Sequence, residues 1–212
     1  MQQAQARFVV LEGIDGAGTT TQTTRLVTTL AAHGITACGT REPSDGVIGK
    51  HLRDLLTGRV LARAASDAQR AAQLALLFAA DRLDHLGSEV QPALSRGEWV
   101  VSDRYDHSSV AYQSVTSGDQ SAIGWLKQLN RYADRPDLTL VLDVSPEVAR
   151  TRRVGRGEAR ELFDDDDLQR QLAAFYLSVE QHFPGDRIVH IDADRSVDAV
   201  FADVLQLVLS LR

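Results

Sequence analysis

The chain has 212 residues, of which 43% are hydrophobic and 25% are charged. Such a length and composition fit one globular domain with a sizeable core and exclude a disordered or collagen-like chain. With 29 acidic and 23 basic residues the formal charge is −6, so no basic surface covers the molecule as in many nucleic-acid-binding proteins, and we expect no nucleic-acid partner.

The single cysteine and the first residues bear on where the protein works. Cys38 cannot form an internal disulfide, and no cysteine–histidine spacing is typical of a zinc site, which fits a reducing cytoplasm. The first six residues are polar, and no apolar run approaches the roughly 18 to 20 residues that span a bilayer. We therefore predict a cytoplasmic protein without a membrane anchor.

Short apolar runs alternate along the chain with segments of helical periodicity. The apolar runs predict strands over residues 8–11, 35–40, 99–101, 138–142 and 187–191. The helical spacing predicts helices over residues 20–30, 65–94 (as one or two helices), 146–153, 168–182 and 197–211. This alternation predicts a parallel sheet with helices on both faces, and no repeat or linker divides the chain.

The glycine-rich turn after the first strand has the spacing of a phosphate-binding loop. Such loops have the form G-x-x-x-x-G-K-[ST], because glycines let backbone N–H groups converge on phosphate oxygens at the start of a helix. Gly13, Gly18 and Thr20 are in register, but Thr19 stands where the lysine is expected. A plain glycine turn is the alternative, and the flanking strand and helix favour the phosphate loop.

The missing lysine has a chemical consequence. Its ammonium normally reaches the β- and γ-phosphates and offsets charge during phosphoryl transfer, whereas the Thr19 hydroxyl is neutral. Lys50 and Lys127 are the only lysines and lie far along the chain, so we expect arginines to supply the charge. Thr20 should still bind Mg²⁺ through its hydroxyl.

An acid and a base follow the third predicted strand. Ligands of open parallel sheets gather at the carboxyl ends of the strands, so we expect Asp103 and Arg104 beside the glycine-rich loop. Asp103 could then hold a metal-bound water and Arg104 a phosphate. A structural ion pair between these two residues is the alternative.

Arginines cluster after the fourth predicted strand. They are Arg150, Arg152, Arg153, Arg156 and Arg160. Residues 154–167 are rich in glycine, arginine and aspartate and show little apolar periodicity, which predicts a mobile surface segment. A solvated face or a nucleic-acid patch is the usual alternative, but the aspartates at 164–167 argue against a polyanion groove. We expect a flap that closes over a nucleotide and excludes water.

Several motifs, taken in order and spacing, are far more specific than any one alone. They are LEGIDGAG (residues 11–18) with TTQ (20–22), TREP (40–43), LFAADR (77–82), DRY (103–105) with SS (108–109) and AYQ (111–113), PDLTLVLD (136–143) and IDA (191–193). Together they resemble the bacterial-type thymidylate kinases, which belong to the P-loop nucleoside monophosphate kinases.

The resemblance implies a five-stranded parallel sheet flanked by helices, of the P-loop NTPase type. It also implies a single kinase domain over residues 1–212, with a short arginine-bearing lid at about residues 152–167. The implied reaction is ATP + dTMP to ADP + dTDP, a step of dTTP synthesis that uses Mg²⁺. The implied assembly is a homodimer formed through helices like the alanine-rich one.

The resemblance assigns a set of residues to dTMP. Phe78 would stack on thymine, Arg82 would bond a thymine carbonyl, and Ser109 and Gln113 would read the base edge. Tyr112 would press against the sugar where a ribose carries its 2′-hydroxyl. The dTMP phosphate is assigned to Arg41, Arg53 and Arg104, and the sugar hydroxyl or metal-bound waters to Asp15 and Glu42.

Each of these residues also has a structural alternative. Phe78 could be core packing, and Arg82 could form a surface ion pair with Asp81 or Asp84. Tyr112 could be a half-buried helix tyrosine and Arg53 a solvated helix residue. Loop capping is the alternative for Asp15 and Glu42.

The resemblance assigns ATP and its phosphates to the glycine-rich loop. The residues are Gly13, Ile14, Asp15, Gly16, Ala17, Gly18, Thr19, Thr20 and Thr21, with Thr20 and Asp103 at the metal. The catalytic residues are Asp15, Arg104, Arg153, Arg156 and Arg160, and no strong base is needed because transfer depends on positioning and charge neutralisation.

Two departures from the family pattern bear on catalysis. Position 16 is glycine, where one branch of the family carries arginine; the other branch supplies this arginine from its lid, as Arg156 and Arg160 would do here. Thr19 leaves two alternatives open. The chain could be a nucleotide-binding relic with little transfer activity, or a kinase for another acceptor such as dUMP or a deoxynucleoside.

Overall fold

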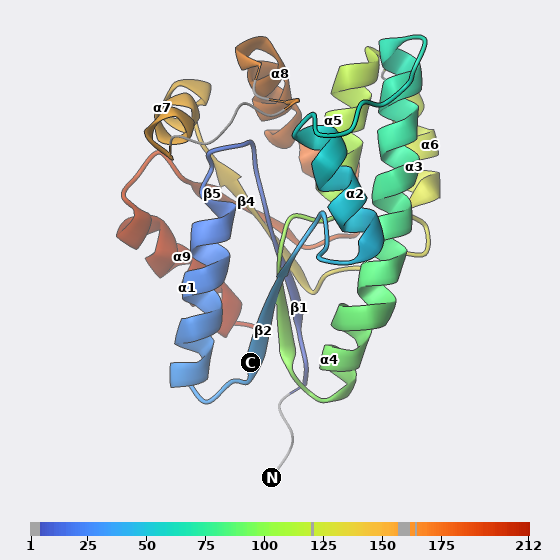
Figure 1. Cartoon of the computed structure of the whole chain (residues 1–212). Coiled ribbons are helices and arrows are strands. Elements are labelled where there is room, and N and C mark those ends of the chain that lie inside the picture. Colours follow the sequence, from blue (N-terminus) through green and yellow to red (C-terminus); the bar gives the residue numbers. More distant parts are fainter. Residues whose placement is uncertain (1–4, 120, 157–161, 164) are drawn as a thin grey trace.

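The computed structural model describes residues 5–119, 121–156, 162–163 and 165–212. Within them a five-stranded sheet has the order β2-β3-β1-β4-β5, and each neighbouring pair is parallel (Figure 1). The strands are β1 (Phe8–Glu12), β2 (Ala37–Arg41), β3 (Trp99–Asp103), β4 (Leu138–Asp143) and β5 (Ile188–Asp192). The predicted α/β fold with a five-stranded parallel sheet is confirmed.

Helices cover both faces of this sheet. Figure 1 shows α1 and α9 on one face, α3 to α6 on the other, and α7 and α8 beyond the carboxyl ends of the strands. The helices are α1 (Thr19–Ala32), α2 (Val47–Leu56), α3 (Asp67–His85), α4 (Gln91–Ser95), α5 (Asp106–Ser117), α6 (Ala122–Leu129), α7 (Pro146–Arg156), α8 (Asp166–Tyr176) and α9 (Val197–Leu209). A π-helical turn, η1 (Leu86–Val90), joins α3 to α4, and a 3₁₀ turn, η2 (Val179–Gln181), follows α8. No helix in the described part of the chain is long and apolar enough to cross a membrane.

The central strand β1 sets the position of the glycine-rich loop. All its residues are buried, and Val9 lies opposite Val101 of β3 and Leu138 of β4. Because the strands are parallel, the loop after β1 and the residues ending β3 and β4 meet at one edge of the sheet. The apolar run at 8–11 therefore determines where the phosphate-binding candidates lie.

The structure corrects several predicted boundaries. Helices α2, α5 and α6 were not expected, and α5 buries polar residues such as Ser109 and Gln113, which weakens its apolar periodicity. The helix predicted over 168–182 ends at Tyr176 and is followed by the 3₁₀ turn. The surface segment predicted over 154–167 is wrong at both ends, since α7 reaches Arg156 and α8 begins at Asp166. Residues 157–161 and 164 of that segment lie outside the described residues.

An ion-pair network at the start of α5 holds this polar helix in place. His107 is fully buried and its Nε2 lies 3.1 Å from Asp186 Oδ2, while Arg135 pairs with both Asp106 and Asp186. Burial raises the pKa of Asp186, but the hydrogen bonds from His107 and Arg135 outweigh it and bring that pKa down to about 2. A carboxyl with a lowered pKa stabilises the fold while it is ionised.

We expect Asp186→Asn to reduce the free energy of unfolding by about 2 kcal/mol at neutral pH, because the pKa of the carboxyl is about two units below its ordinary value. The stabilisation is complete above the unfolded-state pKa near 4 and is lost as pH falls through the folded-state pKa of about 2. Urea unfolding of both proteins between about pH 3 and 8 measures this difference. Asp198→Asn, at an exposed pair with Arg25, is the control and should have little effect.

Candidate active site

The phosphate loop, residues 13–20, ends in an open helix N-terminus. Gly18 is the N-cap of α1, with a left-handed φ of 98°, and no side chain caps that end of the helix. The first backbone N–H groups of a helix lack intrahelical partners, and the helix dipole adds positive potential there. The loop is therefore suited to bind phosphate oxygens.

Gly16 lets this loop pack directly on α7. Its φ is 96°, and a Cβ at this position would lie 2.5 Å from the carbonyl oxygen of Ala149 in α7. From the same helix, Arg153 donates to the backbone oxygen of Asp15 at 2.6 Å. Arg152 donates to the carbonyl of Ala193 at 2.8 Å and so ties α7 to the loop after β5. The arginine-rich helix is thus anchored against the phosphate loop.

A hydroxyl and a carboxylate meet beside the open end of α1. Thr20 Oγ1 donates to Asp103 Oδ2 at 2.5 Å, and Asp103 Oδ1 is buried without a hydrogen-bond partner in the described part of the chain. Hydroxyl and carboxylate oxygens suit Mg²⁺, which takes its remaining ligands from water and substrate phosphates. Consistent with so few protein ligands, the described residues contain no cluster of three or more acidic, histidine or cysteine side chains placed for a metal. The pair Thr20–Asp103 therefore fits the predicted metal position.

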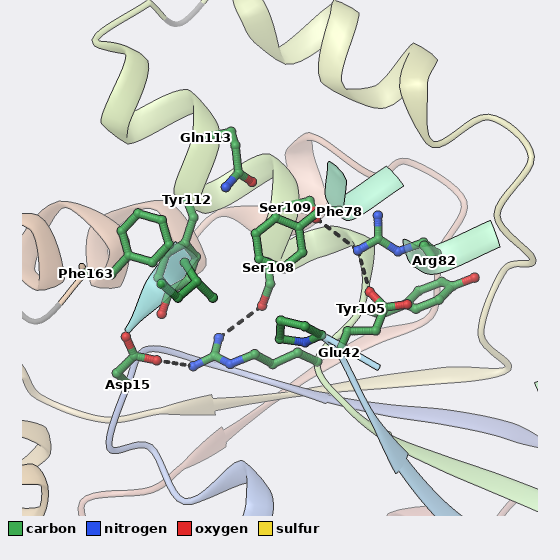
Figure 2. A pocket seen from close by; sticks show the side chains of 13 residues that line it. Asp15, Glu42, Phe78, Arg82, Tyr105, Ser108, Ser109, Tyr112, Gln113 and Phe163 are labelled. Atoms are coloured by element: carbon green, nitrogen blue, oxygen red, sulfur yellow. Dashed lines mark hydrogen bonds and ion pairs between the residues drawn. The ribbon is translucent and has the colours of Figure 1, made fainter. Parts of the chain in front are cut away.

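A cavity opens next to the phosphate loop, between α2, α3 and α5 (Figure 2). It brings together every residue predicted to bind dTMP except Arg41 and Arg53. Its lining residues are Asp15, Glu42, Pro43, Leu56, Phe78, Arg82, Arg104, Tyr105, Ser108, Ser109, Tyr112, Gln113 and Phe163.

One end of the cavity holds a buried guanidinium. Arg82 is 1% exposed, and its Nη2 donates to Glu42 Oε2 at 2.5 Å and to Ser109 Oγ at 2.9 Å. Burial lowers the pKa of Arg82, but Glu42, Asp106 and Tyr105 together raise it overall. Arg82 is therefore neither a surface residue nor a partner of Asp81 or Asp84. Glu42 is likewise no loop cap, since its carboxylate faces Arg82.

Two side chains of this end show a free recognition surface. Gln113 is 1% exposed, and neither its amide oxygen nor its nitrogen has a partner among the described residues. An unpaired buried amide is costly, so Gln113 on the cavity wall is a candidate to form hydrogen bonds with a ligand. Phe78 lines the same wall and is only partly buried, so its ring is available to a planar ligand rather than enclosed in the core.

The opposite end of the cavity contains an aromatic pair. Tyr112 is 6% exposed, so it is almost fully buried rather than half-buried, and its ring lies 5.1 Å from that of Phe163 in an edge-to-face contact (Figure 2). Burial raises the pKa of Tyr112, so the phenol is neutral at physiological pH. The pair forms an apolar wall beside Asp15.

Arg104 joins the cavity to the phosphate loop. Its Nη2 donates to Asp15 Oδ1 at 2.5 Å, and its Nη1 donates to the backbone oxygen of Gly13 at 2.8 Å. Its φ of 72° is the one positive value of a non-glycine residue in the described chain. Burial lowers the pKa of Arg104, but Tyr112 and Asp15 raise it overall. The alternative of an ion pair with Asp103 is wrong, because Arg104 pairs with Asp15.

The other arginines predicted to bind dTMP or its phosphates either do not line the cavity or lie outside the described residues. Arg41 and Arg53 both donate to Asp45 Oδ1 at 2.9 Å, and neither lines the cavity. The hydrogen bond from Arg41 holds the pKa of Asp45 below its ordinary value. Arg160 and the side chain of Arg156 lie outside the described residues.

Sequence reasoning missed several residues that shape this site. Tyr105 and Ser108 occur in the quoted motifs but received no role, and Leu56 lies on a helix that was not predicted. Glu12, fully buried, accepts hydrogen bonds from the backbone N–H groups of Tyr105 and Ser108 and so holds the start of α5. Gln169 had no sequence signal, because its place on α8 is one where an apolar residue is expected.

Comparisons with known proteins agree with this geometry. Residues 11–204 match the family model described as thymidylate kinase. The chain is 40% identical over 207 residues to a probable thymidylate kinase of Thermococcus gammatolerans, covering 95% of each chain. It is 39% identical to a thymidylate kinase of Alkalilimnicola ehrlichii, and the match covers 92% of this chain and 89% of the relative. It is 40% identical to a thymidylate kinase of Bifidobacterium longum, and the match covers 93% of this chain and 94% of the relative.

We expect Gly16→Ala to lower the stability by about 1 to 3 kcal/mol and to raise the KM for ATP, because an alanine at this positive φ is strained and its methyl would push the loop away from α7. Thermal unfolding and steady-state kinetics measure the two effects. Gly34→Ala is the matched control, since Gly34 has a φ of 74° but open space around it. A Gly16→Ala protein that matches the Gly34→Ala protein in both measurements would contradict the packing argument.

Proposed function

The chain belongs to the thymidylate kinase family, and from this membership and the site geometry we propose how its residues divide the reaction. It is an ATP-dependent kinase that transfers the γ-phosphoryl group of ATP to dTMP. A phosphate oxygen of dTMP forms the new P–O bond, the bond between the β–γ bridging oxygen and the γ-phosphorus breaks, and ADP and dTDP are released. This assignment of residues rests mainly on the ion pair between Asp15 and Arg104. The pair links the phosphate loop, which leads into the open N-terminus of α1, to the adjoining cavity.

The cavity is proposed to bind dTMP with its base at the Arg82 end. Phe78 stacks on thymine, and Arg82, Ser109 and Gln113 bind the base edge. Arg82 Nε and the Gln113 amide have no hydrogen-bond partner among the described residues, which supports this assignment because thymine carries both carbonyl acceptors and an N–H donor.

The sugar and phosphate of dTMP are proposed to lie at the other end. Tyr112 packs against the deoxyribose, and Asp15 contacts its hydroxyl or metal-bound waters. Glu42, which was expected to share this role with Asp15, pairs instead with Arg82 at the base end. Arg104 binds the phosphate, because a forked guanidinium matches phosphate oxygens. Arg41 and Arg53 are proposed to add to this charge, which requires them to exchange Asp45 for the phosphate.

The phosphate loop is proposed to bind the phosphates of ATP through residues Gly13 to Thr21. Thr20 and Asp103 are proposed to hold Mg²⁺, directly or through water. When bound there, Mg²⁺ supplies charge that neutralises the phosphate oxygens. The loop and α1 then hold the triphosphate in line with the acceptor cavity.

Arginines are proposed to replace the charge of the missing loop lysine. Arg153 is 14% exposed at its side chain and lies against the backbone of Asp15, which places a fixed cation at the loop. Arg156 and Arg160 are proposed to close over the phosphates with the lid at about residues 152–167. A fixed guanidinium stabilises the charge that develops on the transferring group without further reorganisation.

The assembly and location of the protein are also proposals. We propose a homodimer formed through α3, because Leu76 and Leu83 lie two turns apart on this helix and are 53% and 47% exposed. A single kinase domain is supported by the one sheet that carries both subsites. The lone Cys38 supports the cytoplasm as its compartment.

We expect purified protein with ATP, Mg²⁺ and dTMP to form dTDP, which chromatography of the nucleotides measures directly. With competing acceptors at one ATP concentration, dTMP should be phosphorylated faster than thymidine, which lacks the phosphate that Arg104 is proposed to bind, and faster than dUMP, which lacks the 5-methyl group of thymine. If calorimetry finds dTMP bound but no dTDP forms, the chain is a binding relic. If dUMP or thymidine reacts faster, the assigned acceptor is wrong.

We expect Thr19→Lys to keep the fold and to change kcat by less than about tenfold, that is about 1.4 kcal/mol in the barrier, because arginines already supply the charge. Thermal unfolding and kcat at saturating ATP and dTMP measure this. A larger increase in kcat would mean that the natural loop lacks charge that no arginine replaces. Thr24→Lys, at an exposed position of α1, controls for the added positive charge.

A further inference from the structure

The side-chain amide of Gln169 lies where the phosphate loop and the residues before α8 meet. Gln169 shares one side of α8 with Leu172 and Tyr176, and it is fully buried. A polar side chain at such a position is costly unless its hydrogen bonds are made. Its partners therefore indicate why a glutamine stands there.

Three hydrogen bonds fix the orientation of this amide. Gln169 Oε1 accepts from the backbone N–H of Asp15 at 3.1 Å, and Nε2 donates to Asp15 Oδ2 at 3.0 Å and to the backbone oxygen of Phe163 at 2.8 Å. The oxygen must face the N–H donor and the nitrogen must face the two acceptors. Glutamate lacks the donor, leucine lacks both groups, and asparagine is one methylene shorter, so this set of bonds requires glutamine.

These bonds reach two parts of the proposed acceptor site. Asp15 uses its second carboxylate oxygen, Oδ1, to bind Arg104 at 2.5 Å. The ring of Phe163 packs on Tyr112 and lines the cavity (Figure 2). Through one amide, Gln169 therefore holds the carboxylate that aligns Arg104 and the backbone of a residue in the cavity wall.

We propose that Gln169 is a positioning residue for phosphoryl transfer, an inference that rests on the proposed function. It fixes the Asp15 carboxylate so that Arg104 stays directed at the acceptor phosphate. It also couples that carboxylate to the seating of Phe163, and hence of the chain just before α8. Gln169 touches no reacting atom and exchanges no proton, so its effect acts through Asp15 and Phe163.

The alternative is a core amide that only stabilises α8. Two variants separate these roles: Gln169→Leu, which removes all three bonds, and Gln169→Glu, which keeps the length but removes the donor. Gln171→Leu is the matched control, because Gln171 is exposed on the same helix. For each protein, kcat and KM for dTMP are measured together with the thermal unfolding temperature.

We expect Gln169→Leu to lower kcat/KM for dTMP by about 10- to 100-fold, which is the loss expected for buried hydrogen bonds to a charged group. Gln171→Leu should leave it unchanged. Gln169→Glu places a second carboxylate against Asp15 Oδ2, where the pair can share one proton at lower pH. The activity of the Gln169→Glu protein relative to wild type should therefore rise as pH falls from about 8 to about 6.

This recovery should be specific to Gln169→Glu, since the leucine variant has no proton to share. Arg104 and Arg153, which bind Asp15, limit the recovery because they favour the ionised carboxylates. A residue that only stabilises the fold would give parallel pH profiles for the two variants. Parallel profiles, or a folded Gln169→Leu protein with unchanged kcat/KM, would overturn the positioning role.

Two further outcomes also test the positioning role of Gln169. If both variants fail to fold while wild type is active, Gln169 serves the stability of α8 and the positioning role is wrong. If wild type itself forms no dTDP, the proposed function fails before any variant is compared. The wild-type assay thus separates failure of the function from failure of this inference.

Discussion

The ion pair between Asp15 and Arg104 is the interaction on which the site depends. Asp15 belongs to the phosphate loop and Arg104 follows the neighbouring strand β3, so the pair ties the donor subsite to the acceptor cavity. Phosphoryl transfer needs the two substrates held in line within a fraction of an ångström, because little other chemistry is asked of the protein. The short ion pair is itself held by the Gly13 carbonyl, which accepts from Arg104, and by Gln169, which donates to Asp15. The two subsites are therefore aligned before the substrates bind.

The site is assembled from buried polar groups, most of which are already paired. Glu12 and Asp186 hold the start of α5, and Glu42 holds Arg82. Such paired groups are rigid, since breaking one partnership leaves an uncompensated buried charge. Two of the buried groups left unpaired among the described residues, those of Gln113 and Asp103, lie where a base and a metal ion are proposed to bind.

The substitution of Thr19 for lysine changes the electrostatics of the loop rather than its shape. The glycine conformations and the open start of α1 are those of a phosphate loop, and the backbone N–H groups need no side chain to bind an anion. The lysine would have added a positive charge on a flexible side chain. Here Arg104 and, from α7, Arg153 contact the loop, and the backbone of α7 packs against Gly16 so closely that no side chain fits between them.

Local patterns of the sequence determined the strand and helix alternation and the glycine spacing of the phosphate loop. Most cavity residues were expected only from the resemblance to a family, because no local pattern marks them. The sequence did not predict helix α5, whose buried face is polar, nor the partners of Arg82, which it placed at Asp81 or Asp84. Gln169 had no local signal at all. Such contacts join residues far apart in the chain, as between positions 15 and 169, and only packing of α7 and α8 over the sheet brings them within hydrogen-bond distance.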